Sequence, residues 1–366
     1  MKVEVSTEKL QGAVARIERV AQKHLTLPLL SCVCIEAKKQ ELVLKATNLE
    51  IGVEIRIPAR IETEATVAVP AQILASVLSY NTHSKNVVLE VVGGVLNLKF
   101  ERNSSTIKTL SADDFPIIPE VVPLSQFEIE ASTFSEGLRS VFYTASQSTI
   151  KPELASVYMY TENDELYFVA TDSFRLAEKK VKVPQVEAIP QLLIPAKNIP
   201  EILKILDGVD EVIRVGVDKN QISFSYGSLH CVSRLIEGTF PNYRQILPKQ
   251  YTTECIVLKQ DLLHAFKSAS VFTDKFNQIG FELSPEDKRI LIQTKNSDIG
   301  EHFHEIQGSL KGENLQVNFN YRYIIDSFQS LKADSVFLQF NGMHRPLVIT
   351  GVGDPTFLYL VMPMNK

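Results

Sequence analysis

The chain has 366 residues, of which 45% are hydrophobic and 22% are charged. This composition is typical of a globular protein and excludes a disordered chain, and the length suggests about two or three domains with cores of their own. The formal net charge of −5 argues against a protein that coats nucleic acid with its whole surface, although one basic face is compatible with it.

The amino end and the cysteines indicate a reducing compartment. Residues 1–5 carry charge in place of an apolar core, so we expect no signal peptide, and no apolar run approaches the length of a membrane span. The four cysteines lack the paired spacing of a metal site, and nothing favours a disulfide framework: Cys32, Cys34, Cys231 and Cys255. We therefore expect a cytoplasmic protein without a cofactor.

An amphipathic helix opens the chain, and its pattern returns twice. Ser6 is a predicted helix cap, and apolar residues follow at i, i+3, i+4 and i+7, namely Leu10, Ala13, Val14 and Ile17. The later copies of the pattern are Phe134, Leu138, Val141, Phe142 and Ala145, and then Leu262, Leu263, Phe266 and Ala269. We expect each copy to be the first helix of a domain.

A second helix is predicted in each copy. The apolar faces are Ile73, Leu74, Val77 and Leu78, then Ile199, Ile202, Leu203 and Leu206, then Ile324, Phe328 and Leu331. Short β-branched runs of strand length accompany them at residues 87–91, 96–100, 212–215, 222–225 and 336–340. Because strands and helices do not alternate strictly, this order predicts an α+β fold, with two helices packed on antiparallel sheets in each copy.

A motif near the middle of the chain shows the size of the repeat. An apolar strand followed by Ala-Thr-Asp-Ser-Phe-Arg-Leu-Ala, at residues 166–177, has a copy at residues 42–50 and a looser one at residues 291–298. The threonines of the copies lie roughly 125 residues apart, well beyond the about 20 to 50 residues of solenoid repeats. We therefore predict three tandem copies of one domain, at residues 1–120, 126–246 and 253–366.

Cations lie on the predicted helices, opposite the apolar faces. Taken singly, they are the solvated side of amphipathic helices. Their recurrence in every copy of an acidic chain indicates one basic surface that contacts phosphate backbones without reading sequence. These cations include Lys9, Arg16, Lys23, Arg139, Lys197, Lys204, Lys259 and Lys267.

Catalytic motifs are missing from the sequence, which has no Walker loop, no dinucleotide-binding glycine turn, no H-E-x-x-H and no G-x-S-x-G. His302 and His304 could ligate a metal from one strand face, but a third ligand is unaccounted for, so we interpret them as ordinary surface residues. Asp113, Asp114 and Asp172 are interpreted as turn residues, not as catalytic carboxylates or Mg²⁺ ligands. The sequence therefore predicts a protein that is not an enzyme.

The carboxyl end stays apolar almost to its last residue. Chain ends are usually polar unless they dock, so residues 357–361 are predicted to form a final strand. Met362, Pro363 and Met364 lie beyond this strand. Adaptable methionines beside a proline are compatible with a peptide-binding groove.

Four motifs occur along the chain in this order: Thr26-Leu27-Pro28-Leu29-Leu30, then Ala170-Thr171-Asp172 with Arg175-Leu176-Ala177, then Phe240-Pro241-Asn242-Tyr243, then Val361-Met362-Pro363-Met364. Together they resemble the bacterial β sliding clamps, the processivity subunits of the replicative DNA polymerase, over the whole chain. The resemblance implies three clamp domains per chain and a head-to-tail homodimer closed around double-stranded DNA. Such a ring tethers a polymerase by topology and makes or breaks no bond.

The resemblance also implies a groove for short linear peptides. Its users would be the replicative polymerase subunit, the clamp loader, other polymerases and repair proteins. Arg175 and Asn320 would orient the peptide, and the apolar members would bury its side chains. Phe174, Gln245 and the Asn365-Lys366 end depart from the family pattern, so the preferred peptide stays open. The matching positions are Leu154, Thr171, Ser173, Phe174, Arg175, Leu176, Pro241, Ile246, Phe276, Asn320, Tyr323, Leu360, Val361, Met362, Pro363 and Met364.

For the DNA side, the resemblance indicates that Lys23, His24 and Lys197 keep basic character, whereas Gln72, Pro152 and Glu153 do not. For ring closure, it places one set of first-domain residues opposite a set from the third domain. The first set is Lys99, Arg102, Ile107 and Lys108, and the second is Val271, Phe272, Glu301 and Glu305.

Two alternatives stay open at this point. One is a clamp-like protein that serves only as an interaction scaffold and encircles no DNA. The other is a metal-dependent enzyme of unknown chemistry that uses His302, His304 and nearby acids.

Overall fold

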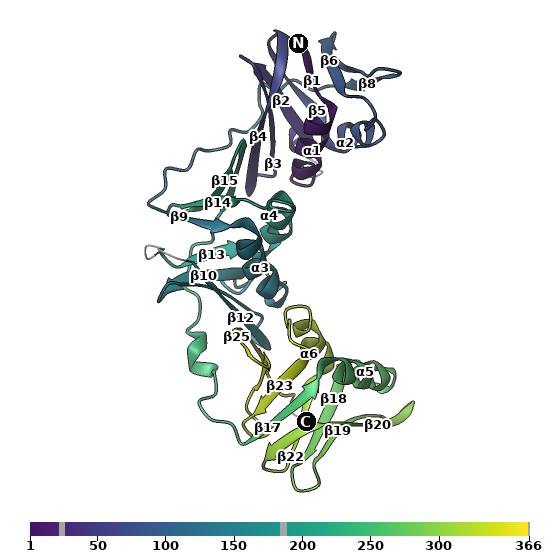
Figure 1. Ribbon diagram of the computed structural model, residues 1–366, viewed down its shortest axis with the longest axis vertical. Coiled ribbons are helices and arrows are strands. Elements are labelled where there is room, and N and C mark those ends of the chain that lie inside the picture. Colours follow the sequence, from purple (N-terminus) through teal and green to yellow (C-terminus); the bar gives the residue numbers. More distant parts are fainter. Residues whose placement is uncertain (22–25, 184–188, 365–366) are drawn as a thin grey trace. The chain divides into compact units, whose positions relative to one another are not determined.

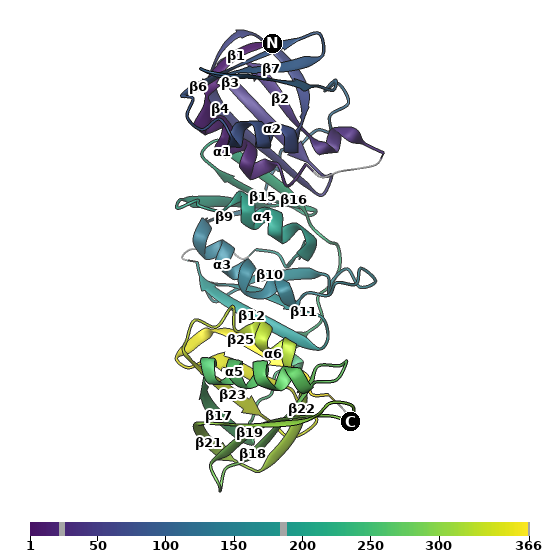
Figure 2. The same cartoon turned by 90° about the vertical axis from the view of Figure 1, so that its right-hand side faces the viewer.

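The computed structural model describes residues 1–21, 26–183 and 189–364 (Figures 1 and 2). The chain forms two compact units, which we call the N-terminal unit (Met1–Thr133 and Asn198–Leu235) and the C-terminal unit (Phe134–Lys197 and Ile236–Lys366). The predicted second domain is therefore divided between the units, and the pairing of its strands explains why.

The N-terminal unit combines the first predicted domain with part of the second. Its elements in chain order are β1 (Lys2–Ser6), α1 (Thr7–Ile17), η1 (Pro28–Ser31), β2 (Cys32–Lys38), β3 (Glu41–Thr47), β4 (Ile51–Thr63), β5 (Ala65–Pro70), α2 (Ala71–Ser79), β6 (Asn86–Val92), β7 (Val95–Lys99), β8 (Ser104–Lys108), β9 (Ser125–Glu130), α4 (Ile199–Ile205), β14 (Val212–Val217), β15 (Gln221–Tyr226) and β16 (Leu229–Arg234).

These strands form one antiparallel sheet of 12 strands. Its main path is β8-β7-β6-β1-β4-β16-β15-β14-β9, and β3, β2 and β5 branch from β4. The long β4 is the junction, because it pairs with β1 and β3 of the first predicted domain and with β16 of the second, where Val53 lies opposite Cys231. This shared ladder covers strand edges that each domain alone would expose.

The helices α1 and α2 lie side by side in this unit (Figure 1). The predicted cap of α1 is confirmed, because Ser6 Oγ accepts a hydrogen bond from the Lys9 amide at 3.4 Å, and all four predicted apolar residues are buried. The predicted face of α2 is partly wrong, because Ile73 is 52% exposed. The buried stripe runs through Leu74 and Leu78, and Ile73 is turned from Leu74 by about 100° around the helix.

The C-terminal unit combines the rest of the second predicted domain with the third. Its elements are α3 (Ala131–Val141), η2 (Phe142–Thr144), β10 (Ser156–Glu162), β11 (Glu165–Thr171), β12 (Arg175–Lys182), β13 (Leu192–Pro195), η3 (Ala196–Asn198), η4 (Tyr243–Ile246), β17 (Thr253–Leu258), α5 (Lys259–Ala269), η5 (Ser270–Phe272), β18 (Gln278–Ser284), β19 (Arg289–Asn296), β20 (Gly300–Ile306), β21 (Gly308–Gly312), β22 (Leu315–Asn320), α6 (Tyr321–Ser327), β23 (Ser335–Phe340), β24 (Leu347–Gly351) and β25 (Asp354–Val361). The first residues of α3 and the last of η3 belong to the N-terminal unit.

Two antiparallel sheets carry this unit, with orders β13-β10-β11-β12-β25-β24-β23-β17-β21 and β20-β19-β18-β22. The helix α3 packs closely on the first sheet, because the rings of Phe134 and Phe168 meet edge to face with centroids 5.6 Å apart. In Figure 2, α5 and α6 lie together, and the rings of Phe266 and Phe328 stack between them at 6.5 Å. The predicted α+β arrangement is confirmed.

The last strand joins the second predicted domain to the third. β25 pairs with β24 on one side and with β12 on the other, in register from Arg175 opposite Val361 to Lys179 opposite Phe357. The predicted final strand is thus confirmed. Its pairing with β12 places the end of the chain beside the repeated Thr171 motif.

The described helices and the cysteines bear on two expectations from the sequence, that no segment crosses a membrane and that no disulfide framework forms. Among the described helices, none is long and apolar enough to cross a membrane. The four cysteines are free and buried, and burial raises the pKa of the Cys231 and Cys255 thiols to about 12. They are therefore unreactive core residues.

Candidate functional site

The repeated motif forms the same turn twice. Thr171 Oγ1 donates a hydrogen bond to the carbonyl of Arg175 at 2.7 Å, and Thr47 Oγ1 donates one to the carbonyl of Ile51 at 2.8 Å. The third residue of each turn has a positive φ, 78° in one turn and 73° in the other. The sequence repeat is therefore a repeat of structure at the level of single hydrogen bonds.

The second residue of each turn, Asp172 or Asn48, caps the turn. Its Oδ1 accepts hydrogen bonds from the amides two and three residues later, at 2.9 and 3.0 Å for Asp172 and at 3.0 and 2.8 Å for Asn48. The predicted turn role of Asp172 is confirmed. In the looser third copy, Thr294 Oγ1 instead donates to the carbonyl of Ala269 at 3.3 Å.

Arg175, the last residue of its turn, connects three elements. Its Nε donates to Asp172 Oδ2 at 2.9 Å, its Nη2 donates to the carbonyl of Tyr143 at 3.1 Å, and its Nη1 donates to Asp326 of α6. The guanidinium carbon lies 4.7 Å from the ring centre of Tyr323, also in α6. Burial by itself would lower the pKa of this guanidinium. The neighbouring Tyr359, Asp326 and Asp172 outweigh burial and raise the pKa above its ordinary value, so Arg175 is a permanent cation.

Residues 362–364 are fixed beside this turn. The Met362 amide donates to the carbonyl of Phe174 at 2.8 Å, and the Met364 amide donates to the carbonyl of Asn318 in β22 at 2.8 Å. These two bonds hold the terminal segment between a turn of the second domain and a strand of the third.

An apolar cluster lies beneath the turn. Leu176 and Leu360 face each other across the β12–β25 ladder and are buried with Phe240 and Tyr243, and Met362 packs against this cluster. Tyr243 begins η4, which ends at Ile246, and its amide donates to the carbonyl of Pro241 at 2.7 Å. The cluster therefore supports both the chain end and the η4 segment.

Large apolar side chains are exposed in the turn, at the end of η4 and in the segment before β18. Phe174 is 60% exposed, Phe276 is 55% exposed and Ile246 is 46% exposed, while residues 362–364 are half-buried. An exposed aromatic side chain on a fixed turn, such as Phe174, is a candidate contact for another molecule. Chemically, this surface suits an extended peptide with apolar side chains.

The structure brings most of the predicted groove residues together, but two of them, Leu154 and Asn320, make contacts that stabilise the fold itself. Leu154 is buried, and its amide and carbonyl bond within the loop to Lys151 and Ser146. Asn320 caps α6, because its Oδ1 accepts from the Arg322 amide at 3.0 Å. Direct contact of any of the predicted groove residues with a peptide stays a prediction.

Sequence reasoning missed three residues of the site: Tyr143, Asn318 and Asp326. Two of them act through main-chain carbonyls, which any residue type supplies. Asp326 lies about 150 residues from Arg175 along the chain, and no spacing pattern in the sequence connects them. The pairing of β25 with β12 helps to bring α6 to the turn, because Tyr359 Oη of β25 donates to the carbonyl of Tyr323 in α6 at 2.8 Å.

Comparison with known proteins decides the family. Sequence models of the DNA polymerase III beta subunit match residues 1–119 with its N-terminal domain, residues 128–242 with its central domain and residues 244–365 with its C-terminal domain. The chain belongs to this family. It is a sliding clamp subunit with three tandem clamp domains, which we now call domains 1, 2 and 3, and it acts as a processivity factor, not as an enzyme. The limits predicted for the domains from sequence stay predictions.

Relatives cover the chain almost from end to end. The beta sliding clamp of Synechococcus elongatus is 28% identical over 374 residues, which cover 100% of this chain and 99% of the relative. The DNA polymerase III beta subunit of Thermotoga maritima has a TM-score of 0.94 at 26% identity, covering 100% of this chain and 99% of that one. A Pseudomonas aeruginosa sliding clamp bound to griselimycin has a TM-score of 0.94 at 24% identity, covering 100% of both chains.

The predicted DNA-facing cations divide into two groups. Arg16 and Lys259 donate to the carbonyls of Ile205 and Leu331, at 3.0 and 2.7 Å, and Lys204 pairs with an acid of its own domain. Lys9, Arg139, Lys197 and Lys267 lie exposed on their elements. Lys23 and His24 fall outside the described residues. Contact of any of these cations with DNA stays a prediction.

The residues predicted at the ring joint require one correction. Ile107 is only 3% exposed, because strand alternation turns it into the core of its own unit while Thr106 and Lys108 point outward. Lys99 pairs with Glu90, and Glu305 pairs with Arg289, both within their own domains. Arg102, Val271 and Glu301 are exposed and Phe272 is half-buried.

The alternative metal site gains no support. In the described ranges, no three His, Cys, Asp or Glu side chains gather in a way that could hold a metal ion. His302 stacks on Phe272 with ring centroids 5.6 Å apart, and its ring lies 6.1 Å from that of His304. Both histidines are half-buried, which corrects their interpretation as surface residues.

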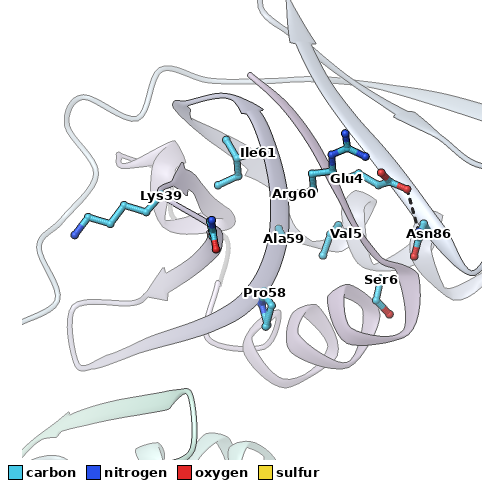
Figure 3. Close-up of a pocket in the computed structure, with 10 residues that line it drawn as sticks. Glu4, Val5, Ser6, Lys39, Pro58, Ala59, Arg60, Ile61 and Asn86 are labelled. Atoms are coloured by element: carbon cyan, nitrogen blue, oxygen red, sulfur yellow. Dashed lines mark hydrogen bonds between the residues drawn. The ribbon is translucent and has the colours of Figure 1, made fainter.

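Figure 3 shows a pocket elsewhere, in domain 1, between β1, β4 and the turn before β3. Its acid, Glu4, accepts a hydrogen bond from Asn86 Nδ2 at 3.0 Å, and its cations Lys39 and Arg60 are exposed. It contains none of the predicted site residues. The pocket therefore takes no part in the site around Arg175.

Proposed function

We propose that two copies of this clamp close head to tail around duplex DNA in the cytoplasm, and that partners dock by short peptides beside Arg175. The observation that carries the docking part is the exposed Phe174 on a fixed turn, whose carbonyl holds the Met362 amide at 2.8 Å. Partners would be the replicative polymerase subunit, the clamp loader, other polymerases and repair proteins.

Two strand edges support the head-to-tail closure. β8 ends one sheet in domain 1 and β20 ends another in domain 3, so each leaves one side without a strand partner in the described chain. An open edge invites pairing with another chain, and a contact between unlike surfaces forms a closed ring when its rotation closes. The exposed Phe303 of β20 and Val271 of η5 would then be covered.

Weak, sequence-independent contacts suit the DNA side. Lys9, Arg139, Lys197 and Lys267 would meet phosphates, and each such contact is screened by salt and carries no base information. A ring held by topology needs no strong contact, and weak contacts let it slide. The acidic net charge of −5 is compatible with this role because only one basic surface needs to meet the DNA.

A peptide of moderate affinity suits the groove. Burial of two large apolar side chains contributes roughly 3 to 6 kcal/mol before the cost of ordering the peptide. The P. aeruginosa clamp named above binds griselimycin, and we propose that the groove of this chain accepts the same compound. Phe174, which is exposed at the turn, would be one of the apolar contacts.

The test of encirclement uses nicked circular DNA, a clamp loader and ATP. The loaded clamp is held at fixed salt, and the circle is then cut with a restriction enzyme. Release that follows cutting supports the ring. Loss that follows salt and ignores cutting would contradict it, and failure to be retained at all would favour an interaction scaffold that encircles no DNA.

A further inference from the structure

The contacts of Arg175 raise the question of what this cation does, because its donors already point at protein groups. Its side chain is 13% exposed and reaches an acid of its own turn, a carbonyl of η2 and Asp326 of α6. The first two partners belong to domain 2 and the third belongs to domain 3. The pair formed by Arg175 and Asp326 therefore crosses the joint between the domains.

The equivalent turn of domain 1 shows that the turn does not require these charges. It closes with the same hydrogen bonds, although it carries Asn48 in place of Asp172 and the buried Ile51 in place of Arg175. A neutral cap and an apolar last residue are enough for the local structure. The charged set of domain 2 consequently serves something beyond the turn.

The pair with Asp326 connects the two sides of the docking surface. On the domain 2 side, the carbonyl of Phe174 holds the Met362 amide at 2.8 Å. On the domain 3 side, α6 carries Tyr323, whose ring lies 4.7 Å from the guanidinium of Arg175 and whose carbonyl accepts from Tyr359 Oη at 2.8 Å. Any contact that fixes α6 against the turn therefore also fixes the distance between Phe174, which is exposed, and Tyr323, which is half-buried.

Other contacts hold the domains together without Asp326. The β12–β25 ladder runs from Arg175 to Lys179, and Ser330, just beyond α6, bonds to Tyr143 Oη at 3.1 Å and to the carbonyl of Ser140 at 2.9 Å. Loss of the Asp326 carboxylate would therefore leave the fold in place and loosen only the wall that α6 provides.

We propose that Asp326 is a positioning residue of the docking surface: its ion pair with Arg175 sets α6 and Tyr323 against the Phe174 turn before any peptide binds. This inference rests on the proposed docking function. Pre-ordering a site removes part of the cost of binding, so the pair strengthens affinity without touching the ligand.

The experiment compares Asp326→Asn with the wild-type clamp and with Asp287→Asn. Asp287 is an exposed acid in the β18–β19 turn of the same unit, so this control repeats the same chemical change away from the joint. Griselimycin binding is measured by calorimetry, and exchange of the Met362 amide is measured by hydrogen-exchange mass spectrometry without ligand. Asp326→Asn is expected to bind about tenfold more weakly and to exchange about tenfold faster, with Asp287→Asn unchanged.

Two further variants separate positioning from a general loss of stability. In an Arg175→Gln background, Asp326→Asn should add less than about twofold, because both changes remove one pair. Asp326→Glu, which keeps the charge, should recover binding to within about threefold of wild type. Three results would each overturn the inference. Asp326→Asn could bind as tightly as wild type, the losses of affinity could add in the double variant, or Asp287→Asn could lose as much affinity as Asp326→Asn.

The readouts also separate this inference from the proposed function. If wild-type clamp fails to bind griselimycin while Asp326→Asn still speeds Met362 exchange, the proposed occupant is wrong and the positioning role stands. If griselimycin binds and neither affinity nor exchange responds to Asp326→Asn, the docking function stands and the positioning role is wrong.

Discussion

Glu136 of α3 is expected to stabilise the joint between domains 2 and 3, and Glu136→Gln tests this. One carboxylate oxygen of Glu136 lies 3.0 Å from the ammonium of Lys179, and the other lies 2.8 Å from that of Lys332. Lys179 is 5% exposed and also donates to Thr356 Oγ1 of β25 at 2.8 Å. The cluster therefore joins α3 and β12 of domain 2 to β25 and the segment after α6 in domain 3.

The cost of the change follows from the exposure of the partners. Removing one member of a buried ion pair costs about 3 to 5 kcal/mol, because the other charge stays buried without its partner. Glu136 is 35% exposed, so water reaches one side of the pair, and we reduce the expected cost to about 2 kcal/mol. Lys332 is 69% exposed, so Lys332→Ala should cost about 0 to 1 kcal/mol.

Urea titration followed by circular dichroism measures both variants, with Lys332→Ala as the matched control. The transition that includes the C-terminal unit should move to lower urea for Glu136→Gln and scarcely move for Lys332→Ala. A Glu136→Gln clamp as stable as wild type would refute the reasoning. So would a Lys332→Ala clamp that loses as much stability as Glu136→Gln.

Three further predictions concern packing, pH and the docking surface. Gly137→Ala should lower the free energy of unfolding by about 1 to 3 kcal/mol in urea titration, because its Cβ would lie 2.3 Å from the buried ring of Phe168. The control Gly12→Ala in α1 meets nothing within 4 Å and should raise the free energy of unfolding by about 0.5 to 1 kcal/mol. Equal effects would contradict the packing argument. Burial opposes the shift, but hydrogen bonds and nearby lysines lower the pKa of Glu136 from its ordinary 4.5 and that of Asp354 from its ordinary 3.8. The stability they contribute is therefore complete above these ordinary values and is lost as pH falls through the lower folded pKa values; a melting temperature of the C-terminal unit that rises on acidification from pH 5 to pH 3 would contradict this. Phe174→Ala should leave the free energy of unfolding within about 0.5 kcal/mol of wild type in urea titration, because the ring is exposed. It should weaken griselimycin binding about tenfold by calorimetry; unchanged binding would remove Phe174 from the docking surface.

Local patterns carried most of the correct predictions. The predicted apolar stripe of α1 is buried, namely Leu10, Ala13, Val14 and Ile17. This prediction succeeded because the spacing of apolar residues follows the 3.6-residue period of a helix. The Thr47 and Thr171 turns were found from sequence for a similar reason, since their hydrogen bonds join residues within four positions of each other. Ile73 failed because two overlapping apolar stripes on α2 fit the sequence equally well, and only packing selected the one through Leu74 and Leu78.

By itself, the sequence determined the three-part repeat, the α+β character and the buried face of α1, because these depend on spacing along the chain, and it carried the motifs whose resemblance indicated the family. The tertiary structure alone decided which domains share a sheet, through β4 with β16 and β12 with β25. It also decided that Ile107 is a core residue and that Asp326 meets Arg175. Strand pairing and ion pairing between distant segments depend on which surfaces remain once each domain has folded, and no local pattern records that outcome.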